Sequence, residues 1–214
     1  MQLYSFYRSS ATYRVRIALN LKEVPYQLLP VHLLRDEGEH RRPELRALNP
    51  QGFVPTLVDG ARVFTQSLAI IEYLDELYPD PPLLPGSARD RARIRGLAQI
   101  IACDIHPLSN IRVVDYLHEV LGAEEAERMA WHRRWITEGL EALESMLADN
   151  PATGEFCHGD DPTLADICLV PQVYNAQRYQ CDLSAFPIIG CITRRCLGIE
   201  AFARAAPERQ PDAE

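Results

Sequence analysis

Residues 2–22, QLYSFYRSSATYRVRIALNLK, predict a strand, a tight turn and a helix. Residues 2–7 suit a short strand, Ser9 and Ser10 suit the turn, and apolar residues recur at helical spacing over 11–22. Arg8, Arg14 and Arg16 crowd this turn in a chain of net charge −8. Either the serines form a plain helix cap beside solvated arginines, or an anion binds at the helix N-terminus, where unpaired N–H groups and the helix dipole favour negative charge.

The pattern continues outward from this turn as a small α/β unit. Strands are expected over 25–29, 54–58 and 62–64, and helices over 43–48 and 67–78. Asp59-Gly60 between the last two strands is typical of a hairpin turn. The first 80 residues therefore predict the order β-α-β-α-β-β-α.

The second part of the chain has a different pattern. The prolines at 79, 81 and 82 break regular structure, so we expect a linker over 81–86 between a domain at 1–80 and a domain at 87–214. Beyond the linker only helices are expected, over 89–120, 124–147, 164–176 and 187–197. Thr163 and Asp166 have the spacing of a capping box, which we interpret as structural.

Composition excludes several classes of protein. The 214 residues are 47% hydrophobic and 24% charged, as in an ordinary globular protein. No signal peptide or membrane span is apparent, so we expect a cytoplasmic protein. The six cysteines lack CxxC spacing, so neither a metal site nor a dithiol redox motif is expected. The chain has a net negative charge and no run of basic residues, which argues against nucleic acid as a binding partner.

Three turns are candidates for a binding site. Ser9-Ser10 and Gln66-Ser67 each precede a predicted helix, and Val54-Pro55 opens a predicted strand. Each has a structural explanation by itself, as a cap or a strand start. Together they offer two helix N-termini and one strand edge, which suits an extended anionic peptide.

Four motifs, in order, resemble the zeta class of the glutathione transferase family: SSATYRVR (9–16), NPQGFVPTLVDG (49–60), TQSLAIIEYL (65–74) and PTLADICLVPQV (162–173). The resemblance runs from residue 1 to about residue 211. It implies an α/β plus all-α fold, with a thioredoxin-like N-terminal domain that binds glutathione and an all-helical C-terminal domain that binds substrate. It also implies a homodimer.

The resemblance assigns site residues by position. Ser9 would bind the glutathione sulfur, and Arg8 and Arg178 would bind carboxylates of the substrate. The remaining glutathione contacts would be Ser10, Ala11, Thr12, Tyr13, Arg14, His40, Val54, Gln66, Ser67, His106, Asn110, Ile111 and Arg112. The chain departs from the class motif at Ala11, where the class has cysteine, and at Tyr13, where it has tryptophan. The first change removes a thiol and counts against thiol-transfer chemistry.

The activity implied is a glutathione-dependent cis–trans isomerisation of maleylpyruvate or maleylacetoacetate in aromatic catabolism. Glutathione thiolate would add to the double bond of this dicarboxylate keto acid, the new single bond would rotate, and elimination would return the trans isomer. His106 is open between a proton donor, a ligand contact and a core histidine, and Arg112 between a substrate contact and a solvated side chain. Two alternatives are a zeta-like transferase of α-halo acids and a non-enzymatic binding protein of the same fold.

Overall fold

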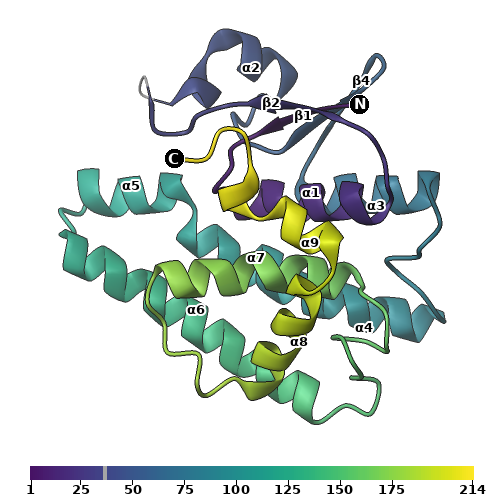
Figure 1. Ribbon diagram of the computed structural model, residues 1–214. Coiled ribbons are helices and arrows are strands. Elements are labelled where there is room, and N and C mark those ends of the chain that lie inside the picture. Colours follow the sequence, from purple (N-terminus) through teal and green to yellow (C-terminus); the bar gives the residue numbers. More distant parts are fainter. Residues whose placement is uncertain (36–37) are drawn as a thin grey trace. The chain divides into compact units, whose positions relative to one another are not determined.

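The computed structural model describes residues 1–35 and 38–214, and its contacts divide them into two units (Figure 1). The first unit is Met1–Leu83 together with Gly198–Glu214, and the second is Leu84–Leu197. The division after Leu83 lies inside the linker expected at 81–86. The placement of Gly198–Glu214 differs from the expected domain at 87–214.

The C-terminal segment belongs to the first unit because it packs on the first helix. Helix α9 (Glu200–Ala205) lies along α1 (Ser10–Leu21), as Figure 1 shows. Asn20 Nδ2 on α1 donates to the Ala201 carbonyl over 2.9 Å, and Arg16 Nε donates to the Ala205 carbonyl over 3.0 Å. Sequence periodicity did not indicate α9, which is a short helix of two turns at most.

Four strands of the described chain form one mixed sheet in the order β2-β1-β3-β4. The strands are β1 (Gln2–Ser5), β2 (Gln27–Pro30), β3 (Thr56–Asp59) and β4 (Arg62–Thr65). β1 pairs parallel to β2, and β3 pairs antiparallel to both β1 and β4. The parallel pair requires the crossover that α1 provides, and the β3–β4 hairpin turns at Gly60, whose φ is +57°.

Helices cover both faces of this sheet. Helices α1 and α3 (Ser67–Leu77) lie on one side, and α2 (Pro43–Leu48) lies on the other (Figure 1). A short 3₁₀ turn, η2 (Glu39–Arg41), precedes α2. Leu3, Ile17, Leu57 and Ile70 are fully buried at the centre of the unit. The predicted order β-α-β-α-β-β-α is confirmed, with element ends shifted by one or two residues.

The second unit contains α4 (Ala88–Gln99), α5 (Ile111–Glu119), α6 (Glu125–Ala148), α7 (Leu164–Arg178) and α8 (Pro187–Leu197). Helix α7 contacts α4, α6 and α8, and most of its residues are buried. The capping box predicted at its start is confirmed, because Asp166 Oδ2 accepts from both the N–H and the hydroxyl of Thr163 over 2.8 Å. Within the described ranges, no helix is both long and apolar enough to cross a membrane.

The single helix predicted over 89–120 is wrong. Helix α4 ends at Gln99. A π-helical turn, η3 (Ile100–Ile105), and a 3₁₀ turn, η4 (His106–Ser109), follow it before α5 begins. Pro107 supplies no N–H for a continuous helix, and Asn110 starts a new one by accepting from the Arg112 N–H over 3.2 Å. Periodicity alone did not register this break.

Candidate active site

The turn after β1 presents Ser9 at the N-terminus of α1. Ser9 has extended backbone angles, and its Oγ accepts from the Thr12 N–H over 3.3 Å, which makes it the N-cap. The Ser9 N–H donates to the Phe6 carbonyl over 3.0 Å, which closes the turn. Ser9 is half-buried, and its hydroxyl makes no other hydrogen bond to a described residue. The O–H can therefore donate to a ligand.

The residues that follow Ser9 point inward. Thr12, Tyr13 and Arg14 are at most 2% exposed, and Ser10 is also buried. Their side chains therefore shape the turn and the helix, while Ser9 and the half-buried Ala11 remain at its surface. This distinction between surface and interior was not accessible from the motif.

Gln66 and Ser67 form a second helix N-terminus. Gln66 has a φ of +69°, which is uncommon for a residue with a side chain. Its Nε2 donates to Gln51 Oε1 over 2.8 Å. Ser67 Oγ accepts from the guanidinium of Arg14 over 3.3 Å, which connects this helix start to α1.

Val54 lies in the loop before β3, and its backbone groups have no partner among the described residues. The Val54–Pro55 peptide bond is cis, and neither the N–H nor the C=O of Val54 bonds to a described residue. Asn49, which the sequence analysis did not single out, holds this loop: its Nδ2 donates to the Phe53 carbonyl over 2.9 Å, and its Oδ1 accepts from the Gln51 N–H over 3.1 Å. Asn49 is buried. Its place before a Pro-Gln-Gly turn was the available signal.

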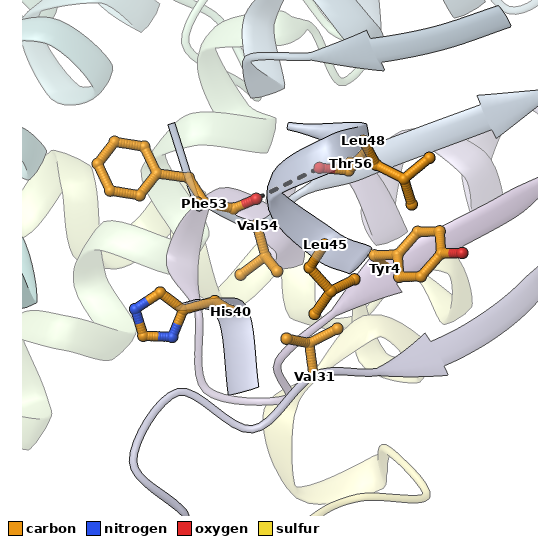
Figure 2. Close-up of a pocket in the computed structure, with 9 residues that line it drawn as sticks. Tyr4, Val31, His40, Leu45, Leu48, Phe53, Val54 and Thr56 are labelled. Carbon is orange, nitrogen blue, oxygen red and sulfur yellow. Dashed lines mark hydrogen bonds between the residues drawn. The ribbon is translucent and has the colours of Figure 1, made fainter. Parts of the chain in front are cut away.

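His40 lies beside Val54 at the rim of a small cavity (Figure 2). The rings of His40 and Phe53 point to the same side, away from the apolar side chains of Tyr4, Val31 and Leu45. The cavity is about 10 Å³, which holds at most about one water molecule. A peptide would therefore lie along the surface between these turns and not inside this cavity.

The second unit carries the other predicted contacts. His106 begins the 3₁₀ turn η4, and Asn110, Ile111 and Arg112 form the start of α5. His106 and Ile111 are half-buried, Arg112 is exposed, and the side chain of Asn110 is used as the cap of α5. Arg178 ends α7 with its guanidinium over the ring of Tyr179, 5.0 Å from the centroid.

Arg8 and Arg178 share one property. Neither makes a hydrogen bond or ion pair with any residue that the structure describes, and each guanidinium lies against aromatic rings, Phe6 and Tyr7 in the case of Arg8. Arg178 also acts on buried His132, whose pKa falls to about 4, chiefly because burial disfavours the imidazolium and then because Arg178 and Arg128 repel it. Both arginines can therefore donate hydrogen bonds to a carboxylate of a ligand.

The structure thus brings together, within the first unit, the turns that carry Ser9, Val54, Gln66 and Ser67. Within the second unit it places His106, Asn110, Ile111 and Arg112 on one continuous segment, and Arg178 at the end of another helix. Two family descriptions match this chain: "Glutathione S-transferase, N-terminal domain" over residues 3–82 and "Glutathione S-transferase, C-terminal domain" over residues 126–188.

The chain belongs to the glutathione S-transferase family.

Individual relatives of this transferase extend the match over almost its whole length. A maleylacetoacetate isomerase of Rhizobium meliloti is 55% identical and aligns with 97% of this chain and 96% of its own. A solved holo structure of a maleylpyruvate isomerase, described as a bacterial zeta-class enzyme, is 50% identical with a TM-score of 0.97, covering 100% of both chains. These matches place the transferase in the zeta class.

A third comparison concerns ligands. The solved structure of a maleylacetoacetate isomerase from Anaeromyxobacter dehalogenans is 39% identical, has a TM-score of 0.87, and covers 100% of this chain and 93% of its own. It contains dicarboxyethyl glutathione and citrate in its active site. The fold predicted for the transferase, a thioredoxin-like domain followed by a helical domain, is confirmed by the two family matches and these structures.

Proposed function

We propose that this protein is a glutathione-dependent cis–trans isomerase that converts maleylpyruvate to fumarylpyruvate, or maleylacetoacetate to fumarylacetoacetate, in aromatic catabolism. The observation that carries the proposal is the full-length similarity to proteins named as these two isomerases, at 50% and 55% identity. Proteins this similar over their whole length share a fold, and residues 3–82 match the N-terminal domain of the family.

The residues of the first unit fit glutathione. The N–H and C=O of Val54, which bond to no described residue, suit the backbone of the cysteinyl residue. The N-terminus of α3 at Gln66 and Ser67 suits the γ-glutamyl carboxylate. His40, at the rim beside Val54, would contact the glycine end. Ser9, Ser10 and Ala11 would form the turn around the sulfur. Thr12, Tyr13 and Arg14 would act through this turn, because their side chains are buried.

Ser9 has the task of stabilising a thiolate. The pKa of a thiol is near 8.5 and must fall by about two units for the thiol to be mostly ionised at neutral pH. This shift requires the thiolate to be stabilised over the thiol by about 2.7 kcal/mol. A helix N-terminus supplies ~0.3–1 kcal/mol, and a hydrogen bond to a charged acceptor supplies ~1.5–3 kcal/mol. The helix dipole alone is too weak, and the dipole together with the Ser9 hydroxyl is sufficient.

Glutathione supplies the sulfur that adds to the substrate's double bond and leaves again after rotation. Arg8 and Arg178 would bind the two carboxylates of the substrate, since neither has a carboxylate partner among the described residues. Their positive charge would also stabilise the negative charge that develops on the keto acid during addition. His106, Asn110, Ile111 and Arg112 would supply further contacts to glutathione, and His106 and Arg112 are also candidates for contact with the substrate.

Ala11 supports isomerisation over thiol transfer. It lies in the first turn of α1, where a cysteine would have a lowered pKa and high reactivity. With alanine there, the turn contains no protein thiol that could form a mixed disulfide. The alternatives of an α-halo acid transferase and a non-enzymatic binding protein are not favoured by relatives that are named as isomerases.

One assay tests the proposal. Purified protein, glutathione and maleylpyruvate are mixed, and the absorbance of the conjugated keto acid is followed together with the free thiol. Conversion without loss of thiol is expected, and maleylacetoacetate in competition gives the preference between the two. Consumption of thiol in proportion to product would contradict isomerisation. If neither substrate were converted, the proposal would fail and the alternative of a non-enzymatic binding protein would be favoured.

Two further predictions concern the state of the protein. We infer a homodimer, which the family implies, and a cytoplasmic location, which composition favours. Sedimentation equilibrium at micromolar concentration tests the first, with a mass near twice the 24.2 kDa of the chain expected. Fractionation of the source cells tests the second.

A further inference from the structure

The C-terminal segment holds the turn that carries Ser9. Asp212 lies 205 residues from Tyr7, and its Oδ2 accepts from the Tyr7 N–H over 2.9 Å. Tyr7 is buried, and the turn that it starts ends at Ser9, whose own N–H bonds back to the Phe6 carbonyl. Asp212 is half-buried.

Arg16 ties the other side of the same peptide to the same segment. Its Nη2 donates to the Tyr7 carbonyl over 2.9 Å and its Nε donates to the Ala205 carbonyl over 3.0 Å. Its Nη1 reaches Ser5 Oγ over 3.2 Å. Burial lowers the pKa of Arg16 to about 10, while Tyr26, Tyr13, Asp212 and Glu208 act in the opposite direction, so Arg16 stays charged at neutral pH.

The N–H and the C=O of Tyr7 are therefore both fixed, one by Asp212 and one by Arg16. Arg8 and Ser9 are the next two residues, and both are proposed to contact ligands. A hydrogen bond from Ser9 to a sulfur depends on the position of its Oγ within a few tenths of an ångström, because such bonds weaken steeply with distance and angle. Glu214, two residues after Asp212, is held as well, since it forms an ion pair with Arg35 and its Oε1 lies 3.7 Å from His32 Nε2.

We propose that Asp212 is a positioning residue for the reaction: by holding the Tyr7 N–H, its carboxylate sets the position of the Ser9 hydroxyl and thereby the pKa of bound glutathione. This inference rests on the proposed function, since it takes Ser9 to bind the sulfur. It assigns a task in the chemistry to the last residues of the chain, which belong to the thioredoxin-like unit and not to the helical one.

The test compares three variants. Asp212→Ala removes the acceptor, and Asp212→Asn keeps an oxygen acceptor without the charge. Glu200→Ala is the control, because it removes an exposed carboxylate of the same segment that pairs with Arg209 and is not among the groups that act on Arg16. Each is assayed for exchange of the Tyr7 amide hydrogen in glutathione-free protein, for the pH titration of bound glutathione by thiolate absorbance, and for kcat and KM.

Asp212→Ala is expected to speed exchange of the Tyr7 amide about tenfold or more and to raise the pKa of bound thiol by about half a unit to one unit, with kcat at pH 7 falling roughly threefold to tenfold. The dissociation constant for glutathione should change less than about twofold, because Val54, Gln66 and Ser67 are untouched. Asp212→Asn and Glu200→Ala should behave like the unaltered protein.

An unchanged thiol titration in Asp212→Ala would overturn this inference alone, even if the variant melts at a lower temperature, because a purely structural role lowers stability without moving the titration. An equal rise in Asp212→Asn would also overturn it, since the hydrogen bond would then not be the cause. If the unaltered protein binds glutathione without ionising it, the proposed function fails first and this inference fails with it.

Discussion

The Arg14 guanidinium donates to Ser67 Oγ over 3.3 Å and so joins the N-terminal turns of α1 and α3. Arg14 is only 1% exposed. Both helix starts are proposed to hold glutathione, one at its sulfur and one at its γ-glutamyl end. The buried arginine therefore fixes the two ends of the proposed site relative to each other within one unit.

Replacing Ser67 by alanine tests this connection. We expect Ser67→Ala to weaken glutathione binding about tenfold and to lower the free energy of unfolding by about 1–3 kcal/mol, because a buried charged donor loses one of its acceptors. Calorimetric titration and urea denaturation measure the two effects. Ser87→Ala, which removes the N-cap of α4 in the other unit, is the matched control and should leave glutathione binding unchanged.

The hydroxyl of Ser9 can be tested apart from its cap. Ser9→Ala should raise the pKa of bound glutathione by about one to two units, because ~1.5–3 kcal/mol of thiolate stabilisation is lost. Ser9→Gly should raise it equally while keeping more stability, since glycine caps helices better than alanine. Thiolate absorbance against pH is the measurement. A titration that does not move in either variant would remove Ser9 from the sulfur.

Arg8 is predicted to act on the substrate and not on glutathione. Arg8→Ala should raise KM for the keto acid about tenfold to a hundredfold, and Arg8→Lys should restore only part of it, because lysine cannot bind a carboxylate through two parallel N–H groups. Steady-state kinetics at saturating glutathione measure this. Arg62→Ala, at an exposed arginine on β4, is the control and should match the unaltered enzyme.

The capping box of α7 is predicted to serve stability only. Thr163→Ala should lower the free energy of unfolding by ~0.5–2 kcal/mol. Asp166→Ala should lower the free energy of unfolding further, because Asp166 is fully buried and also accepts from the Cys157 N–H over 2.8 Å. Urea denaturation gives the stability and kinetics of the folded fraction give the activity. A change of KM in Thr163→Ala would show that the box affects the site.

His132 predicts a pH dependence of stability. Its pKa of about 4 in the folded protein is below the ordinary 6.5, so the unfolded chain binds more protons between these values and stability falls as pH falls from 6.5 towards 4. The slope from this group is at most about 1.4 kcal/mol per pH unit. His132→Phe keeps a ring against Tyr179 without a titrating group, so its unfolding free energy should fall less steeply over this range.

That comparison is made by urea denaturation at pH 7, 6 and 5 in both proteins. The carboxylates and other histidines contribute equally to each, so only the difference between the two slopes reports on His132. Identical slopes would mean that His132 titrates alike in the folded and unfolded chain.

Local pattern was enough for most of the elements. Some elements depend only on residues close together in sequence, so the conformational propensities of those residues were enough to predict them. These are the strand–turn–helix from Gln2 to Leu21, the hairpin at Gly60 and the capping box of Thr163 and Asp166. The same reasoning missed the break between α4 and α5. Apolar periodicity continues across Pro107, but the proline and the Asn110 cap interrupt the backbone hydrogen bonds on which a helix depends.

The sequence by itself determined the family, the order of the elements and the identity of Ser9 as a cap, because each rests on neighbouring residues or on a motif. Only the tertiary structure decided three further features. Thr12, Tyr13 and Arg14 face inward, the backbone of Val54 bonds to no described residue, and Asp212 bonds to the Tyr7 N–H. Such facts depend on which distant segments pack together. A contact across 205 residues leaves no periodicity in the chain, since its partners are brought together by burial elsewhere.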